Sequence, residues 1–538
     1  MIHHKTKIVA TIGPASDTPE AITELVGTGV NVFRINAAHC EPELIRQLIR
    51  RIRRVGRELR VGIGILVDLQ GPKIRVGSFV RAEPIWLQAG RPLIITTEPG
   101  VLGEKASPGA ITRIGTRYEG LAKDVKPRAK ILLDDGNIEL RVMKVKGREI
   151  YTKVVFGGLL KQHKGINLPG SKVSTDCVTP EDLEDLAVAL EEGADYVALS
   201  FVRSHRDIER LRTHIGDSEF EVGIIAKIER PEAVKNLRKI VDVADGMMVA
   251  RGDLGVEIGA EFVPALQKKI IQLANEQHKP VITATQMLES MVVNPRPTRA
   301  EASDVANAIY DGTSAVMLSS ETASGKYPVQ AVKFMRRIIR ETERDMFSDD
   351  KTFRFRRESQ RGASITHATV RAAVSAAFGV GGKAIAVFSE GGATAQAIAS
   401  ERPSTPVIAF TPFQRTVQRL ALVWGVSAYR ALRTRTSHEM TLEGERILFE
   451  EKLVQPGEHF VVVVGASRQQ GLTNIMHIRT MAREGSDRAV KGAKSGKSAK
   501  SGRSGKPTKA PVKPKRSRGS GSKPDAPGFE NTSESGGS

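Results

Sequence analysis

Short apolar runs alternate with amphipathic stretches from residue 6 to about residue 347. Eight runs are apolar enough for buried strands: TKIVATI, NVFRIN, GILVDL, DYVALSF, GIIAKI, GMMVAR, PVITATQ and AVMLSSE. Stretches with helical spacing separate them, among them PEAITELVGTG, PEDLEDLAVALEEG and PALQKKIIQLANEQHK. Continuous apolar runs are typical of parallel strands that are covered on both faces. Eight such strands with intervening helices predict a (β/α)8 TIM barrel.

One interval interrupts this alternation. Roughly 125 residues separate GILVDL from DYVALSF, and the first hundred hold the β-like runs IRVGSF, PLIITT, AKILLDD, IELRVMKVKG and EIYTKVVF. The pattern predicts a small β domain, residues 71–170, inserted after the third barrel strand. The barrel would then consist of residues 1–70 and 171–347. Insertions at this face of a barrel commonly form lids over the active site.

A second alternating series follows a charged connector, DDKTFRFRRESQRG. The strand-like runs are KAIAVFS, PVIAFT, VSAYRAL and HFVVVVGA, and helical stretches such as TAQAIASER and QRTVQRLALVW separate them. Residues 348–484 are therefore predicted to form a three-layer α/β domain.

The last segment, residues 485–538, is rich in lysine, serine and glycine. From Lys491 to Lys509 a basic residue recurs at every third position, and no aromatic residue is interleaved. Such a segment cannot bury a core, so it is predicted to be a disordered basic tail. Two interpretations stay open: weak binding of polyanions, or an inert, solubilising tail.

Composition narrows the class of protein. The 538 residues carry a net charge of +20, and 40% of them are hydrophobic, which is enough for several domain cores. Thirteen basic residues against four acidic ones follow Gly485, so nearly half of the excess charge belongs to the tail. The rest suits an enzyme of anionic, phosphorylated metabolites. Cys40 and Cys177 do not have the spacing of a metal site, and the N-terminus lacks the pattern of a signal peptide. No apolar run approaches the ~20 residues that span a bilayer. We therefore expect a soluble, cytoplasmic protein.

The stretch from residue 222 to residue 255 concentrates candidate chemistry. Two apolar runs flank PEAVKNLRKIVDVA, whose spacing predicts a helix over residues 231–244. Lys227 and Glu229 share one face of the first run because side chains alternate along a strand. Asp253 follows the second run, at the same edge of a parallel sheet. A lysine and two carboxylates there suggest a divalent metal beside an anionic substrate. The alternative is an interstrand salt bridge with a glycine turn.

Polar groups lie at the ends of all the predicted barrel strands from the second to the eighth. These groups are Arg34 and Asn36, Asp68, Ser200, Lys227 and Glu229, Gly252 and Asp253, Thr285 and Gln286, and Ser319, Ser320 and Glu321. In a barrel the strand ends meet at one rim, where active sites form. The rim therefore predicts an active site rather than scattered structural charges.

The residue types at this rim suggest the reaction. Glu229 and Asp253 suit Mg²⁺ (or Mn²⁺), which takes few protein ligands and keeps positions for substrate oxygens. Arg34 and Lys227 suit a phosphoryl group, and the backbone N–H groups that follow the sixth strand suit a carboxylate or phosphate. This set predicts metal-assisted phosphoryl transfer on a small acidic substrate. The chain has no GxxxxGK[ST] run and no pairing of HRD with DFG, which excludes the two common kinase folds.

Several longer motifs carry a resemblance. TKIVATIGPAS, IIAKIERPEAV, MMVARGDLGVE, ATQMLESM, NPRPTRAEASDVANAIYDGTSAVMLSSETA and the late GLTNIM resemble those of the pyruvate kinase family, in its order, across roughly residues 5 to 480. The resemblance implies Mg²⁺-dependent transfer of the phosphoryl group of phosphoenolpyruvate to ADP, giving pyruvate and ATP in the last step of glycolysis. It also implies a homotetramer.

The resemblance also implies roles for individual residues. Lys227 would stabilise the transferring phosphoryl group and the enolate, and Glu229 and Asp253 would hold Mg²⁺. The substrate-binding set would be Arg34, Lys227, Gly252, Asp253, Thr285 and Ser200, with Lys227, Arg34 and Thr285 catalytic. The nucleotide-binding set would be Arg75, Lys164, Thr11, Pro14, Asn36 and His39. For His39, capping of a helix is the alternative.

Departures from the family pattern concern a monovalent cation. Many members bind K⁺ through an Asn, a Ser, an Asp and a Thr, and here Asn36 and Asp68 remain while Ala38 and Leu69 replace the other two. Lys73 stands where those members have glutamate, so its ammonium can supply the missing positive charge. This pattern resembles the K⁺-independent subgroup and predicts that K⁺ is not required.

Two further departures from the family pattern, at residue 320 and in the loop from Ser389 to Thr394, have no single interpretation. Ser320 replaces a glycine of the family's LSGETA motif, and no consequence follows from the sequence. The loop from Ser389 to Thr394 matches the family's sugar-phosphate effector site, but Glu390 stands where a lysine often helps. A phosphorylated allosteric effector, such as a monophosphate or nucleotide, and an unliganded turn are both compatible with this loop.

A different enzyme class also fits part of the pattern. A metal-dependent lyase or aldolase barrel that stabilises a pyruvate enolate would use a similar rim. The inserted domain, with Lys164 near its exit, favours a second, nucleotide-bearing substrate instead.

Overall fold

A computed structural model gives the structure of the protein. It describes residues 4–105, 107, 110–171, 173–216, 222–348, 364–432, 436–465 and 473–482. The predicted basic tail and the charged connector lie outside these residues. Within the described ranges, no helix is both long and apolar enough to cross a membrane.

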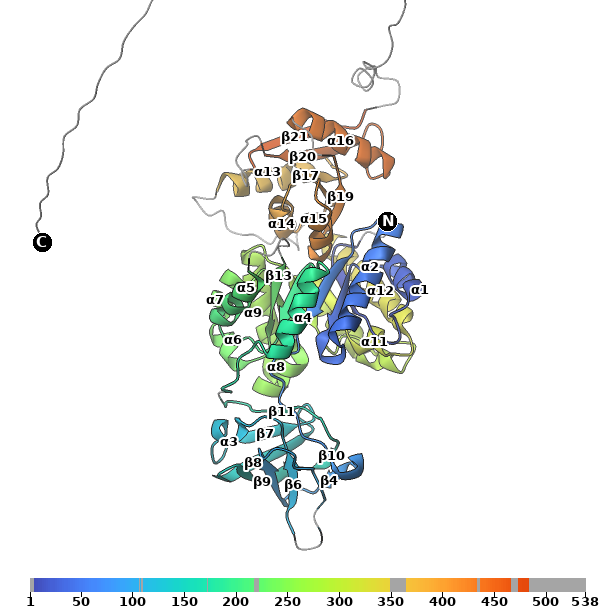
Figure 1. Ribbon diagram of the computed structural model, residues 1–538. Coiled ribbons are helices and arrows are strands. Elements are labelled where there is room, and N and C mark those ends of the chain that lie inside the picture. The colour runs from blue at the N-terminus through green and yellow to red at the C-terminus, as the bar shows by residue number, and fades with distance from the viewer. Residues whose placement is uncertain are drawn as a thin grey trace, which may run out of the picture. The chain divides into compact units, whose positions relative to one another are not determined.

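Eight parallel strands close into a barrel, as the apolar runs predicted (Figure 1). Around the barrel the strands follow the order β1, β16, β15, β14, β13, β12, β3, β2. Their bounds are β1 Lys7–Thr11, β2 Val32–Asn36, β3 Gly64–Asp68, β12 Tyr196–Leu199, β13 Gly223–Ile228, β14 Gly246–Ala250, β15 Val281–Ala284 and β16 Ala315–Leu318.

Helices surround the barrel and cover its outer face (Figure 1). They are α1 Pro19–Thr28, α2 Pro42–Glu58, α4 Pro180–Glu191, α5 His205–Ile215, α6 Pro231–Lys235, α7 Leu237–Val243, α9 Val263–Glu276, α10 Arg299–Tyr310 and α12 Pro328–Ser348. Two short helices, α8 Arg251–Ile258 and α11 Ser320–Ala323, directly follow the ends of β14 and β16. Their ends follow local signals: Thr179 caps α4 in a reciprocal box with Asp182, and Gly193 takes φ +68° just beyond it.

Two apolar layers fix the barrel. The outer layer lies between strands and helices, and the inner layer fills the lumen with side chains such as Val9, Leu66 and Ile225. Leu422, from a 3-10 turn of the C-terminal domain, is fully buried in the inner layer, and Tyr196 Oη donates to the carbonyl of Arg419. The lumen is therefore a packed core, and chemistry is restricted to its rim.

The inserted segment forms a β domain between β3 and α4. A six-stranded sheet runs in the order β11, β7, β8, β9, β5, β6, and β4 pairs with β10. The bounds are β4 Ile85–Leu87, β5 Pro92–Thr96, β6 Thr112–Gly115, α3 Leu121–Asp124, β7 Lys130–Leu133, β8 Ile138–Lys146, β9 Glu149–Phe156, β10 Gly158–Leu160 and β11 Ile166–Asn167. The domain has its own buried cluster, which includes Leu93, Ile131 and Leu140.

The C-terminal domain has a five-stranded sheet in the order β19, β18, β17, β20, β21. Its elements are α13 Ile365–Gly379, β17 Ile385–Phe388, α14 Ala393–Ser400, β18 Val407–Thr411, α15 Gln414–Arg419, β19 Val426–Arg430, α16 Ser437–Glu450, β20 His459–Val464 and β21 Ile475–Thr480. Separate core clusters cover its two faces, one with Val370 and Ile398 and one with Leu448. This is the predicted three-layer arrangement.

Two local predictions were wrong, and one strand of the C-terminal sheet was missed. IRVGSF forms no regular strand and makes the isolated bridges Arg75 to Gly165, Val76 to Thr116 and Phe79 to Gly103. The helix predicted for residues 231–244 breaks at Asn236, whose side chain instead donates to the carbonyl of Arg203. The edge strand β21, antiparallel to β20, was not predicted.

Candidate functional site

Strand register brings the predicted rim residues together. Ala198 lies opposite Asp68, and Leu199 lies opposite Ala226, so Ser200 follows beside Lys227. Lys227 Nζ donates to Ser200 Oγ at 2.7 Å, and it lies 3.2 Å from Asp68 Oδ1 and 2.9 Å from Glu229 Oε1. Ser200 Oγ donates in turn to the Leu69 carbonyl at 2.7 Å. One ammonium is thus fixed on three sides.

The charge of Lys227 is secured by its neighbours. Its side chain is only 12% exposed, and burial alone favours the neutral amine. The carboxylates of Asp68 and Glu229 outweigh burial and raise the pKa of Lys227 above its usual value. The site therefore holds a permanent positive charge.

Asp68 also pairs with Arg34, the second residue predicted to bind phosphate. Arg34 Nε lies 2.7 Å from Asp68 Oδ2, and Arg34 Nη1 donates to Thr11 Oγ1 at 3.1 Å. Burial raises the pKa of Asp68, but the positive charges of Lys227 and Arg34 more than compensate, so that its pKa is lowered. Both oxygens of this carboxylate are occupied by cations of the protein.

Glu229 and Asp253 fit a divalent cation. Glu229 Oε2 accepts from the Phe201 N–H at 2.9 Å, whereas Oε1 is buried and makes no hydrogen bond of good geometry, although Lys227 Nζ is close. Burial raises the pKa of Glu229 against the opposing charge of Lys227, and the negative charge of Asp253 raises it further. Among the described residues, no three His, Cys, Asp or Glu side chains gather as a metal site. Two carboxylates suit Mg²⁺, which completes its shell with water and substrate oxygens.

Thr285 is linked directly to the first turn of α8. The Gly252 N–H donates to Thr285 Oγ1 at 2.8 Å, and Thr285 Oγ1 donates to the Ala284 carbonyl at 2.7 Å. Thr285 and Gln286 have φ of +66° and +55°, a left-handed conformation that costs a non-glycine residue about 1–3 kcal/mol. The surrounding contacts must hold this backbone in place.

A cleft of about 750 Å³ opens beside these groups, within the range of small-molecule sites. Eight residues with a predicted binding or catalytic role line it: Thr11, Pro14, Arg34, Asn36, His39, Gly252, Asp253 and Thr285. Gln286, Ser319 and Ser320 of the predicted rim line it as well. Lys227, Glu229, Ser200 and Asp68 do not line it, and their side chains are largely buried at the strand ends. Burial, followed by the positive charges of Arg75, Arg34 and Lys73, lowers the pKa of His39, so this imidazole is neutral at neutral pH.

Arg75 and Lys164 are not brought into the cleft. Arg75 Nη1 donates to the His163 carbonyl at 3.3 Å, and Lys164 Nζ pairs with Asp134 at 2.7 Å. Lys73 and Asp135 do line the cleft, and Asp135 comes from the inserted domain. Asp135 was missed by sequence reasoning, since a turn such as Asp134-Asp135-Gly136 signals only a change of direction.

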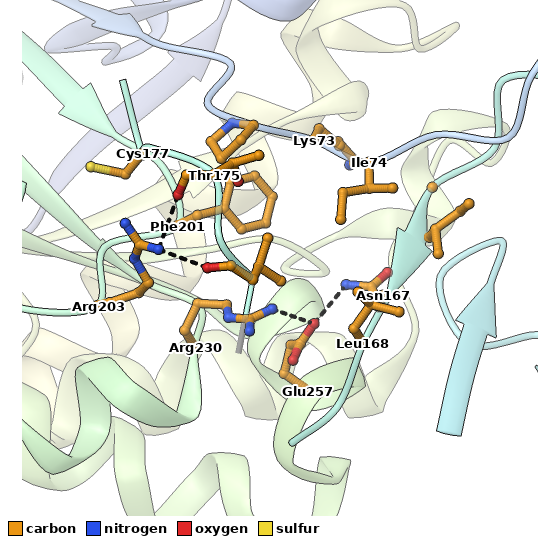
Figure 2. Close-up of a pocket in the computed structure, with 14 residues that line it drawn as sticks. Lys73, Ile74, Asn167, Leu168, Thr175, Cys177, Phe201, Arg203, Arg230 and Glu257 are labelled. Carbon is orange, nitrogen blue, oxygen red and sulfur yellow. Dashed lines mark hydrogen bonds and ion pairs between the residues drawn. The ribbon is translucent and has the colours of Figure 1, made fainter. Parts of the chain in front are cut away.

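A smaller pocket of about 40 Å³ lies where the inserted domain meets the barrel (Figure 2). Glu257 Oε1, from α8, accepts from Asn167 Nδ2 at 3.2 Å and from Arg230 Nη1 at 3.1 Å, as the dashed lines in Figure 2 mark. Arg230 Nη2 also donates to the Ser171 carbonyl at 3.1 Å. Burial raises the pKa of Glu257 despite the nearby charge of Arg230. The helix that carries Gly252 and Asp253 is therefore bonded to the inserted domain.

The loop from Ser389 to Thr394 connects β17 to α14, as predicted. Gly392 has φ +88°, and its N–H donates to Ser389 Oγ at 3.0 Å. Thr394 Oγ1 lies 2.7 Å from Thr473 Oγ1, so the loop contacts the threonine of the GLTNIM motif. Gly471 and Leu472 of that motif lie outside the described residues.

Comparisons with known proteins agree with this geometry. Residues 3–332 match the family described as pyruvate kinase, barrel domain, and residues 367–479 match pyruvate kinase, alpha/beta domain. The chain is 43% identical to pyruvate kinase 2 of Synechocystis over 87% of this chain and 77% of that protein. It is 40% identical to pyruvate kinase of Agrobacterium vitis over 89% of this chain and 97% of that protein. A crystal structure of pyruvate kinase from Cryptosporidium parvum superposes with a TM-score of 0.80 at 33% identity, covering 89% of this chain and 96% of that one.

Proposed function

The chain belongs to the pyruvate kinase family, and we propose that its buried Lys227–Ser200–Asp68 cluster serves the transfer of a phosphoryl group from phosphoenolpyruvate to ADP. In this reaction an oxygen of the ADP β-phosphate attacks phosphorus and the bond to the enol oxygen breaks. The enolate then takes a proton at its methylene carbon, which gives pyruvate. The observation that carries the residue assignment is the ammonium of Lys227, fixed at the strand ends beside the cleft.

Lys227 and Arg34 would provide the positive charge for this transfer. Negative charge builds on the phosphoryl oxygens and on the enolate oxygen, and preorganised cations stabilise it without reorganisation. Asp68 and Ser200 hold the two cations in place, so Ser200 would contribute to substrate binding through Lys227. Thr285 and the first turn of α8, with Gly252 and Asp253, would bind the substrate carboxylate.

The family requires a divalent metal, and Glu229 with Asp253 would hold Mg²⁺ or Mn²⁺ here. When bound, the ion would supply charge to the phosphoryl and enolate oxygens. The buried carboxylate of Glu229, beside the negative charge of Asp253, supports this assignment.

The nucleotide would occupy the outer part of the cleft. Thr11, Pro14, Asn36 and His39 line its wall, and a neutral imidazole suits contact with a ribose or base rather than with phosphate. Arg75 and Lys164 would reach the phosphates after exchanging their present partners, the His163 carbonyl and Asp134. This exchange is part of the proposal.

We also propose that the enzyme needs no K⁺. Asp68, half of the remaining monovalent-ion set, already carries Arg34 and Lys227, and Lys73 adds an ammonium to the cleft. Assembly as a homotetramer, a cytoplasmic location and a phosphorylated effector at the Ser389–Thr394 loop belong to the same proposal. The alternative lyase or aldolase activity is not favoured by the family match.

A coupled assay tests the assignment. Turnover of phosphoenolpyruvate and ADP is followed through reduction of the pyruvate product by lactate dehydrogenase. Wild-type protein is expected to turn over, and Lys227→Met is expected to lose about 10³-fold or more in kcat, as for removal of a transition-state cation. Full turnover by a folded Lys227→Met protein would contradict the proposed mechanism.

A further inference from the structure

Arg251 is the first residue of α8, and its side chain lies beside the strained segment after β15. The side chain is 8% exposed, and its guanidinium contacts three consecutive carbonyls. Nη2 donates to the Thr285 carbonyl at 2.7 Å and to the Gln286 carbonyl at 3.2 Å, and Nε lies 3.3 Å from the carbonyls of Ala284 and Thr285. Nη2 is also 2.8 Å from Met287 Sδ.

Left-handed φ values explain why these carbonyls can meet. In an extended strand successive carbonyls point to opposite sides, whereas two left-handed residues turn them toward a common point. Thr285 and Gln286 are the two residues in that conformation. A planar guanidinium with five N–H groups can bond several carbonyls and a carboxylate at once, whereas a lysine ammonium has only three N–H groups on one atom.

The guanidinium is anchored from the other side. Arg251 Nη1 lies 2.8 Å from Asp304 Oδ1 and 2.7 Å from Asp304 Oδ2, on α10. A hydrogen bond in the reverse direction also joins these two segments, because the Gly252 N–H donates to Thr285 Oγ1. Movement of the Arg251 side chain would therefore release Thr285 and the first turn of α8 together.

We propose that Arg251, anchored by Asp304, is a positioning residue that fixes Thr285 Oγ1 against the substrate-binding turn of α8. This proposal rests on the proposed function of that turn. Arg251 does not line the cleft and does not touch substrate; it acts through Thr285. Nothing in the proposed chemistry uses its charge directly.

The test compares Arg251→Lys with a matched variant elsewhere in the barrel. Arg53 offers the control: it is also mostly buried, donates to the carbonyls of Ile63 and Gly193, and pairs with Asp195, away from the cleft. Arg251→Lys is expected to lower kcat/KM for phosphoenolpyruvate about ten-fold while KM for ADP stays within about two-fold. Arg53→Lys is expected to lower Tm to a similar extent and to leave both parameters unchanged.

A double-mutant cycle separates positioning from general destabilisation. If Arg251 acts through Thr285, the Arg251→Lys effect on kcat/KM disappears in a Thr285→Ala background. Full additivity of the two substitutions, or an equal loss in Arg53→Lys, would overturn the proposal. Asp304→Asn keeps the shape of the side chain but removes the anchoring charge. This variant is expected to reproduce part of the loss in kcat/KM for phosphoenolpyruvate.

Failure of the proposed function is distinguishable from failure of this inference. If the wild-type protein does not turn over phosphoenolpyruvate and ADP, the function itself is wrong. If the wild type turns over and Arg251→Lys matches it within about two-fold in kcat/KM for phosphoenolpyruvate, only the positioning role is refuted.

Discussion

Arg34 and Asp68 form a buried ion pair at the ends of adjacent barrel strands, with 2.7 Å between Nε and Oδ2. The other oxygen of the same carboxylate lies 3.2 Å from Lys227 Nζ. A single anion therefore sets the positions of two cations, of which Arg34 lines the cleft. Its own charge is stabilised by them, which is why the pKa of Asp68 is lowered in spite of its burial.

Asp68→Asn is expected to impair catalysis more than binding of the nucleotide. The amide cannot neutralise Arg34 and Lys227, so both side chains lose their fixed positions, and kcat/KM for phosphoenolpyruvate should fall about 100-fold. Asp195→Asn is the matched control, because Asp195 is equally buried and pairs with Arg53 away from the cleft. Steady-state kinetics and Tm of both variants check this: equal kinetic losses in both would refute the special role of Asp68.

The requirement for K⁺ is expected to depend on Lys73. Wild-type turnover in tetramethylammonium buffer should stay within about two-fold of that in K⁺, because Lys73 supplies the positive charge. Lys73→Glu should create a dependence on K⁺ of about ten-fold or more, since the carboxylate offers a ligand and removes the ammonium. Wild-type activity without K⁺ below a tenth of that with K⁺ would contradict this prediction.

Asn167→Ala is expected to loosen the connection between the inserted domain and α8. The substitution removes the hydrogen bond to Glu257 but leaves the Arg230–Glu257 ion pair, so the cost to folding should be about 1–2 kcal/mol. KM for ADP should rise about three-fold or more, because Lys164 and Asp135 belong to that domain. Tyr151→Phe, which removes a hydrogen bond to Glu149 within the same domain, should leave KM unchanged. An unchanged KM in Asn167→Ala would mean that this contact does not position the domain.

Asp185 is expected to destabilise the protein at neutral pH. Burial, with the negative charges of Asp182 and Glu184, raises its pKa from the ordinary 3.8 to about 6. An acid whose pKa is higher in the folded state stabilises that state while it is protonated, so this contribution is full below pH 3.8 and is lost as the pH rises through about 6. Asp185→Asn should therefore raise Tm at pH 7, and its advantage over wild type should shrink as the pH falls toward 4. A constant difference in Tm across this range would contradict the assignment.

The sequence predicted the barrel well because parallel strands covered on both faces leave continuous apolar runs that few other structures produce. The two segments that were assigned wrongly or missed have different local causes. IRVGSF has the composition of a strand, yet Arg75 and Val76 find only single bridging partners. In β21, exposed positions such as His477 and Ile478 give no clear alternation, because the strand lies at the edge of its sheet.

For the candidate site, strand ends identified Lys227, Glu229 and Asp253 because chemistry at a barrel rim requires charged residues where apolar ones are the rule. The pairing of Ser200 with Lys227 follows from strand register, which apolar runs do not specify. The contacts of Arg251 are with backbone carbonyls, which have no sequence signature at all. Spatial partners of this kind become visible only in the fold.

Closure of the barrel has a consequence for synthesis of the chain. β1 pairs with β2 on one side and with β16 on the other, although more than 300 residues separate Lys7 from Ala315. At about 5–20 residues per second, one edge of β1 would remain open on the ribosome for roughly 15–60 s. The inserted domain, complete within the first third of the chain, can fold during this interval. A ribosome-bound intermediate with a folded lid and an exposed first strand is the form that a nascent-chain chaperone would meet.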